Sequence, residues 1–212
     1  MHLDASKGNV TSAVVGVVIA GGRSVRFGGE KAVAILHGLP LLIWAVRRLQ
    51  RTCAAVAVNA RPGTQTEALA RANGLPLLYD QEGDPLGPLA GVKVALRWAS
   101  DLGAASLAVS PCDVPRLPED LFPRLIEAAG GGAAMAETTE GNQPLCAVWP
   151  VSALPQVAEA LSGGRHPPTW RLLEQVGAQR VRFSAAECFA NVNTVEDLAA
   201  LSRVAAPVPP RG

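Results

Sequence analysis

Apolar and polar residues alternate along this chain in two patterns, one typical of buried strands and one typical of helices. Residues 14–20 form a continuous run rich in β-branched side chains and followed by paired glycines, as in a strand buried on both faces. Helical spacing of apolar positions, with basic residues near the C-terminal end, predicts a helix over 41–51. Further strands are predicted over 55–59, 75–79 and 106–110, and further helices over 64–73, 89–102 and 118–129.

The pattern loosens after Gly130, where the predicted elements become shorter. Two strands, 133–137 and 145–149, flank a polar turn over 138–142. Helices are predicted over 151–161, 170–176 and 195–204, and an extended segment over 180–183. Because strands and helices alternate through the first half, we expect a mostly parallel sheet with right-handed crossovers and helices on both faces, a Rossmann-like three-layer α/β sandwich.

Length and composition fit one such domain. The 212 residues suit a single α/β unit, which we place at 13–204, with loose tails at 1–12 and 205–212. Hydrophobic residues make up 49% and aromatic residues only 4%, so the core must be built mainly from Ala, Val and Leu. The formal net charge of +1 provides no global field that would attract nucleic acid or an anionic membrane surface.

The sequence also argues against metal-cluster, disulfide-rich and membrane-spanning classes. Its four cysteines contain no C-x-x-C pair, and its three histidines have no metal-ligand spacing. We therefore expect buried free thiols in a reducing compartment at Cys53, Cys112, Cys146 and Cys188. No apolar run reaches the roughly 18 residues of a membrane helix, and the first residues do not resemble a secretion signal, which predicts a cytoplasmic protein.

The stretch IAGGRSVRFGGEK, residues 19–31, is the most informative motif. A predicted strand leads directly into glycines whose backbone N–H groups can approach phosphate oxygens, and Arg23, Arg26 and Lys31 can supply countercharge to a triphosphate. The spacing matches neither the Walker A loop nor the G-x-G-x-x-G dinucleotide fingerprint. The alternative is a flexible glycine loop with solvated arginines, but the strand immediately upstream favours a phosphate loop.

Polar residues lie at or just after the ends of three predicted strands, at the edge of the sheet where ligands bind in open α/β folds. These are Asn59, Asp80 and Asp113. A carboxylate beside a triphosphate is favourable only with a cation between them, so Asp113 is a candidate Mg²⁺ ligand. The alternative for each residue is a turn-forming Asx side chain.

The segment DPLGPLAG, residues 84–91, connects the third strand to the next helix. Its glycines and prolines, Gly87 among them, predict a preorganised helix N-terminus that can contact an anion or a base. An ordinary strand-to-helix loop is the alternative.

These motifs occur together in the order found in one family. IAGGRSVRFGGEK, VAVNAR, LYDQ, GPLAG, SPCDVP, QPLCAVW and FANVNTVEDL resemble those of the molybdenum cofactor guanylyltransferases, within the wider glycosyltransferase-A-like nucleotidyltransferases. The resemblance covers residues 14–201. It implies a Mg²⁺-dependent transfer of GMP from GTP to the terminal phosphate of molybdopterin, with release of pyrophosphate.

The resemblance also implies a set of site residues. The catalytic set is Lys31, Arg26 and Asp113, with Asp113 as the metal ligand. The nucleotide-binding set is Ile19, Ala20, Gly21, Gly22, Lys31, Asn59, Asp80, Gly87 and Asp113. Asn191, Asn193 and Arg165 are assigned to the pterin side. Transient contacts with molybdopterin-carrying proteins or molybdoenzyme chaperones are a further expectation, and contacts with nucleic acid or membrane are not expected.

Three positions depart from the family pattern. Glu30 stands where Asp usually precedes the lysine, and Val195 replaces the usual proline of the last motif. The stretch GGRHPPT, residues 163–169, keeps only part of the family's basic element.

Other functions remain open at the level of the sequence. The sister cytidylyltransferases usually carry Ala-Ala-Gly where this chain has Ala20-Gly21-Gly22, and an added Cβ there would crowd a purine, so the glycine favours guanine. Sugar-phosphate and isoprenoid nucleotidyltransferases have similar loops. A non-catalytic nucleotide-binding adaptor would be expected to lose Lys31 or Asp113, and both are present.

Overall fold

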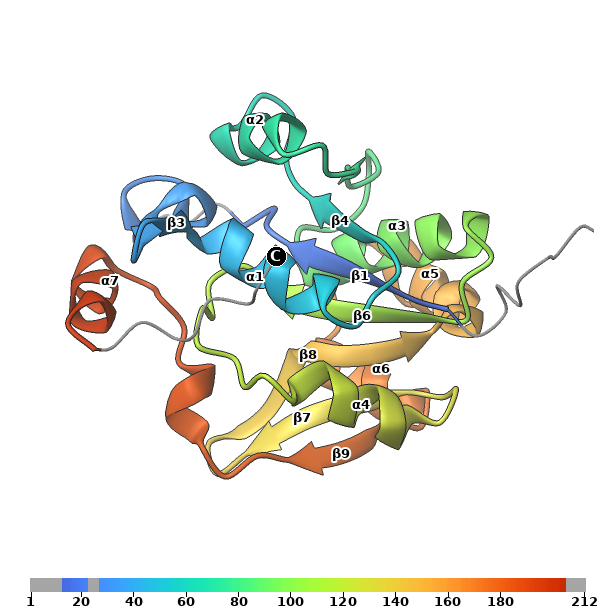
Figure 1. Ribbon diagram of the computed structural model, residues 1–212. Coiled ribbons are helices and arrows are strands. Elements are labelled where there is room, and N and C mark those ends of the chain that lie inside the picture. Colours follow the sequence, from blue (N-terminus) through green and yellow to red (C-terminus); the bar gives the residue numbers. More distant parts are fainter. Residues whose placement is uncertain (1–12, 23–26, 205–212) are drawn as a thin grey trace, which may run out of the picture.

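A computed structural model describes residues 13–22 and 27–204, and it is built around one seven-stranded sheet (Figure 1). The strands lie in the order β5-β4-β1-β6-β8-β7-β9. Their bounds are β1 Val14–Ile19, β4 Val56–Asn59, β5 Leu77–Leu78, β6 Ser106–Pro111, β7 Ala134–Thr138, β8 Gly141–Pro150 and β9 Gln179–Arg182.

The first half of the chain supplies parallel strands, as the alternating pattern predicts. β1 pairs in parallel with both β4 and β6, and β4 pairs in parallel with β5. β8 is antiparallel to its neighbours β6 and β7, while β7 and β9 are parallel. The reversal has a local cause: Thr138 pairs with Gly141, so a two-residue turn joins β7 to β8 and the chain must run back antiparallel.

Seven helices of the described chain surround the sheet. Their bounds are α1 Leu41–Gln50, α2 Gln65–Ala72, α3 Pro88–Asp101, α4 Leu121–Ala129, α5 Leu154–Ser162, α6 Thr169–Gln175 and α7 Val195–Ser202. Short 3₁₀ turns lie at η3 Lys31–Val33, η4 Val151–Ala153 and η5 Ala186–Phe189. None of the described helices has the length and apolar character needed to cross a bilayer.

Two hydrophobic cores lie on opposite faces of the sheet, because successive side chains of a strand point in opposite directions. Val18 and Val58 belong to one core together with residues of α1 and α4. Val17 and Val109 belong to the other core together with residues of α3, α5 and α6. Figure 1 shows these two groups of helices on the two sides of the sheet. The predicted three-layer architecture is thereby confirmed.

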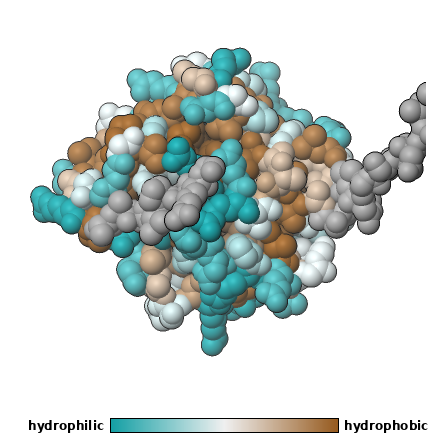
Figure 2. Space-filling view, in the orientation of Figure 1, coloured by the Kyte–Doolittle hydropathy of each residue, from teal (hydrophilic) through white to brown (hydrophobic). Residues whose placement is uncertain are grey.

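The sheet ends at β9, an edge strand that carries charge. Arg180 and Arg182 project from it and form ion pairs with Glu137, and Arg180 also pairs with Glu174. Figure 2 shows hydrophilic residues gathered in the lower middle of the molecule, where Figure 1 shows α4 and β9. Charged side chains of this kind discourage another strand from pairing with an open edge.

Several sequence-based boundaries were wrong in detail. The helix predicted from residue 118 begins at Leu121, because Pro118 lies in a separate turn whose carbonyl accepts a bond from the Leu121 N–H, at 3.2 Å. A small hairpin of β2 (Ile35–Leu36) and β3 (Leu39–Pro40) was missed. Two-residue strands are too short to show periodicity, and their turn depends on positive φ angles at His37 and Gly38.

The cysteine prediction holds in part. The four cysteines are free, and Cys53 and Cys146 are buried, but Cys112 and Cys188 are only partly buried. The tails predicted at 1–12 and 205–212 lie outside the described residues.

Candidate active site

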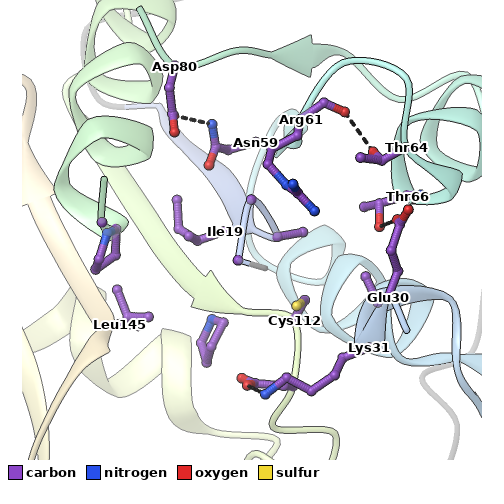
Figure 3. A pocket seen from close by; sticks show the side chains of 18 of the residues that line it. Ile19, Glu30, Lys31, Asn59, Arg61, Thr64, Thr66, Asp80, Cys112 and Leu145 are labelled. Carbon is purple, nitrogen blue, oxygen red and sulfur yellow. Dashed lines mark hydrogen bonds and ion pairs between the residues drawn. The ribbon is translucent and has the colours of Figure 1, made fainter. Parts of the chain in front are cut away.

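A cavity of about 740 Å³ opens at the carboxyl ends of β1, β4 and β6, where the fold predicts a ligand site (Figure 3). Its walls come from the loop after β1, the start of α3, the loop after β6 and the segment before α7. The lining residues are Ile19, Ala20, Gly21, Gly22, Glu30, Lys31, Ala32, Asn59, Arg61, Thr64, Thr66, Asp80, Leu86, Gly87, Pro88, Pro111, Cys112, Asp113, Leu145 and Asn193.

An ion pair between Lys31 and Asp113 lies in this cavity. The Lys31 Nζ is 2.7 Å from Oδ2 of Asp113, and it also donates to Oδ1 of Asn193 at 3.2 Å. The backbone supports the arrangement, because the Val192 N–H donates to the Asp113 carbonyl at 2.8 Å. Lys31 and Asp113, which the family resemblance assigns to the catalytic set, therefore line the same cavity.

Asn59 and Asp80 form a second polar pair, at the ends of β4 and β5. Asn59 Nδ2 donates to Asp80 Oδ1 at 2.8 Å and to the Leu78 carbonyl at 3.3 Å, and the residue is 2% exposed. Two glycines leave room for this amide. A Cβ on Gly21 would lie 3.3 Å from Asn59 Oδ1, and one on Gly91 of α3 would come closer than 3 Å to the same side chain. The Asn59 side chain is therefore confined to one position by its hydrogen bonds and by the two close glycines.

Glu30, directly before Lys31, caps the N-terminus of α2. Its carboxylate accepts bonds from the backbone N–H of Gln65 at 2.9 Å and of Thr66 at 2.8 Å, and from the Thr66 hydroxyl at 2.6 Å. Burial raises the pKa of Glu30, but the bonds from Thr66 and Gln65 and the nearby Arg61 guanidinium outweigh it, so the pKa lies below its ordinary value. The ionised side chain ties the glycine-rich loop to α2.

Arg61, the last residue of the VAVNAR motif, also lines the cavity, although the sequence alone indicated no role for it. It lies two residues beyond Asn59, and Figure 3 shows its side chain extending into the cavity between Asn59 and Thr64. Within the described chain, Arg61 forms no ion pair with a carboxylate. A strand-end position and a positive charge were the signals that could have identified it. The cavity thus holds a cation available to an anionic ligand.

Most of the predicted site residues that the structure describes meet in this cavity, and two do not. The cavity brings together Ile19, Ala20, Gly21, Gly22, Lys31, Asn59, Asp80, Gly87, Asp113 and Asn193. Asn191 and Arg165 are exposed and do not line the cavity, so their pterin-side role stays a prediction. Arg26 lies outside the described residues.

The carboxylate oxygens of the cavity suit a hard cation whose remaining ligands are water and phosphate oxygens. In the described residues, no three His, Cys, Asp or Glu side chains gather into a metal cluster. Of the cavity carboxylates, Glu30 accepts bonds from α2 and Asp80 accepts one from Asn59, whereas Asp113 pairs with Lys31. Mg²⁺ is commonly held by one or two carboxylates together with phosphate oxygens and water. The Asp113 carboxylate fits this ion better than a metal that requires a full protein cage.

Comparisons with known proteins identify the family to which this chain belongs. The model of the MobA-like NTP transferase domain matches residues 16–182. The chain is 38% identical to the molybdenum cofactor guanylyltransferase of Cereibacter sphaeroides over 185 residues, which cover 87% of this chain and 93% of the relative. The enzyme of the same name from Rhodobacter capsulatus is 38% identical over 188 residues, 88% of this chain and 93% of the relative.

A solved structure shares the fold. Molybdopterin-guanine dinucleotide biosynthesis protein A from Archaeoglobus fulgidus superposes with a TM-score of 0.72 at 23% identity, over 89% of this chain and 96% of that one. The cavity at the strand ends, the matched domain and the close relatives lead to one conclusion: the chain belongs to the molybdenum cofactor guanylyltransferases, nucleotidyltransferase enzymes with a MobA-like NTP transferase domain.

Proposed function

We propose that this chain transfers GMP from GTP to the terminal phosphate of molybdopterin, forming the guanine dinucleotide and releasing pyrophosphate. The observation that carries the proposal is the Lys31–Asp113 pair, 2.7 Å apart beside the glycine-rich loop. A cation and a metal-type carboxylate together are what a nucleoside triphosphate and its Mg²⁺ require. The names of the relatives supply the identity of the substrates.

Each of the two polar pairs of the cavity binds a different part of the nucleotide. Asn59 and Asp80 take the nucleoside, through amide and carboxylate oxygens that can bind ribose or base donors. Lys31 takes the phosphates, with the backbone N–H groups of Gly21 and Gly22 beside it. Arg61 extends between these ends and adds a second positive charge.

Asp113 is the residue that would hold Mg²⁺. When bound, the ion neutralises phosphate charge and helps to align the triphosphate for displacement. In the structure the Asp113 carboxylate is occupied by the Lys31 ammonium, so we infer that Lys31 moves from Asp113 to the phosphates when the nucleotide enters.

The reaction needs positioning more than acid–base chemistry. The acceptor oxygen of molybdopterin belongs to a phosphate that is largely ionised at neutral pH, so its attack on the α-phosphorus requires no strong general base. The bond from the α-phosphorus to the bridging oxygen breaks, and pyrophosphate leaves with that electron pair. Lys31 stabilises the departing charge. Arg26 is proposed to assist from the same loop.

Guanine is favoured over cytosine by the space at Gly21. A Cβ at this position would lie 3.3 Å from the Asn59 amide oxygen and 4.0 Å from the Asp80 carboxylate. The glycine therefore widens the cavity on the side that we assign to the base. Asn193, bonded to Lys31, is proposed to lie on the pterin side, with Asn191 and Arg165 farther out. Release of the product to a molybdopterin-carrying protein or molybdoenzyme chaperone is proposed to occur through transient contact.

The test is direct. The protein is incubated with Mg²⁺, molybdopterin and GTP labelled at the α-phosphate, and the expected products are the labelled dinucleotide and one pyrophosphate per transfer. CTP in place of GTP is expected to give little product. Preferential use of CTP would indicate the cytidylyltransferase instead, and tight GTP binding without pyrophosphate release would indicate a non-catalytic adaptor.

A further inference from the structure

The connection between α5 and α6 contacts the start of α3, although the two are distant in sequence. The Leu89 N–H donates to Nε2 of His166 at 3.0 Å, across 77 positions of the chain. His166 lies in the GGRHPPT stretch that departs from the family pattern, and it has no role in the function proposed above. Gly87 and Pro88, next to Leu89, line the cavity.

This contact replaces a helix cap that the local sequence cannot provide. The N-cap of α3 is Gly87, which has no side chain, and Pro88 at the first position has no N–H. Leu89 therefore carries the first free N–H of the helix, and an acceptor must come from elsewhere. The imidazole of His166 supplies it.

The fit between the ring and the loop is close. An added Cβ on Gly87 would stand within 3 Å of three atoms of the His166 ring, and Gly87 has a φ of 152°. No side chain can therefore be placed on Gly87 while the ring keeps its position. Burial lowers the pKa of His166, partly offset by hydrogen bonds with the backbone of residues 166 and 167. A neutral ring with an unprotonated Nε2 is the form that accepts the Leu89 N–H.

The first turn of α3 then reaches the nucleoside end of the cavity. Gly91, two residues beyond Leu89, lies so close to Asn59 that a Cβ would clash with its amide. Any shift of this turn would move the wall at Gly87 and the contact at Asn59 together. The first turn of α3 therefore contacts His166 through Leu89 and lines the cavity through Gly87 and Pro88.

We propose that His166 is a positioning residue for nucleotide binding, which fixes the wall formed by Gly87 and Pro88 by capping α3. The inference rests on the proposed function only in taking GTP as the ligand. It predicts that the segment after α5 affects the affinity for GTP without touching the reacting phosphates.

Two variants distinguish the effect of the hydrogen-bond acceptor at His166 from the effect of the side-chain volume. His166→Leu keeps much of the volume and removes the acceptor, whereas His166→Gln places an amide oxygen near the position of Nε2. His37→Asn is the control, because it changes an exposed histidine that does not line the cavity, and Asn tolerates its positive φ.

We expect His166→Leu to weaken GTP binding by about threefold to tenfold, the effect of one lost hydrogen bond. The Kd for GTP is measured by calorimetry, and the KM for GTP should rise in parallel with little change in kcat or in the KM for molybdopterin. His166→Gln should restore most of the affinity. Urea denaturation shows whether each variant is folded.

Unchanged GTP affinity in a folded His166→Leu protein would overturn the inference, as would equal losses in the Leu and Gln variants. A fall in kcat alone would also overturn it. The binding experiment does not require turnover, so its result does not depend on whether the protein forms the dinucleotide. If the wild-type protein bound GTP but formed no dinucleotide, only the proposed function would fail.

Discussion

Lys31 connects three parts of the chain through one ammonium group. It follows the glycine-rich loop, binds the carboxylate of Asp113 and reaches the amide of Asn193, which lies 162 positions away. The lysine and aspartate side chains are only 14% and 21% exposed, so their charges are screened less than those of a surface pair. Loss of either partner leaves a partly buried charge in the cavity.

Asp113→Ala is expected to abolish transfer while leaving the fold intact. The residue lies in a loop after β6, and the proposed role of its carboxylate is to hold Mg²⁺. Pyrophosphate release at saturating Mg²⁺ measures activity, and circular dichroism checks the fold. Turnover retained in this variant would remove Asp113 from the mechanism.

Lys31→Ala is expected to cost about 2–4 kcal/mol of transition-state stabilisation, as for the loss of one preorganised donor. This corresponds to a fall in kcat/KM of about 30- to 1,000-fold. Arg97→Ala, which removes an exposed cation from α3 outside the cavity, is the control. A rate equal to that of the control would contradict the phosphate-loop assignment.

At the scale of elements, the cavity is shaped by how α2 and α3 begin. Glu30 caps α2 from the glycine-rich loop, and Thr64 caps it locally by accepting the Glu67 N–H. α3 approaches β4 so closely that only glycine fits at position 91. Both helices therefore place their N-termini against residues of the cavity.

Gly91→Ala is expected to affect the stability of α3 and the binding of GTP differently. Alanine favours a helix interior over glycine by up to about 1 kcal/mol, but its Cβ would displace the buried Asn59 amide. We expect weaker GTP binding, measured by calorimetry, that is out of proportion to any change in the urea midpoint. A variant that binds GTP normally would show that the Asn59 position does not matter for the nucleotide.

Glu30→Gln removes the charge that caps α2 while keeping the length of the side chain. We expect a loss of about 1 kcal/mol in the free energy of unfolding, typical for a weakened cap, and a higher KM for GTP because the loop before Lys31 is released. Urea titration and steady-state kinetics check the two effects. Glu127→Gln, on α4 away from the cavity, is the matched control.

At the scale of the whole molecule, the lowered pKa values of several groups make the folded state less stable in acid. Burial lowers the pKa of His166, and hydrogen bonds from the backbone of Asn193 and Thr194 lower that of Asp197. The pKa of Glu30 is also lowered. A lowered pKa in the folded state means that the unfolded chain takes up protons first, so acid destabilises the fold.

We therefore expect the urea midpoint to fall in two stages as the pH decreases. His166 contributes below its ordinary pKa of 6.5, and Glu30 and Asp197 contribute below 4.5 and 3.8. In His166→Gln the first stage should shrink while the second remains. A midpoint that rises on acidification, or an identical first stage in the variant, would contradict this assignment.

The order of strands and helices could be predicted from the sequence because it depends on local periodicity. β1 and the larger helices have runs long enough to show a strand or helix pattern, and their predicted positions agree with the structure to within a few residues. The residues at strand ends were predictable for a related reason: in a parallel sheet, Asn59 and Asp113 must emerge at the same edge.

The sequence by itself thus determined the α/β architecture, the glycine-rich loop and the polar residues at the strand ends, since each follows from neighbours in the chain. Only the tertiary structure decided the capping of α2 by Glu30, the entry of Arg61 into the cavity and the contact of His166 with α3. These depend on pairs such as His166 and Leu89, 77 positions apart. Hydrogen bonds of this range leave no periodic trace, because only the packing of finished elements brings their partners within reach.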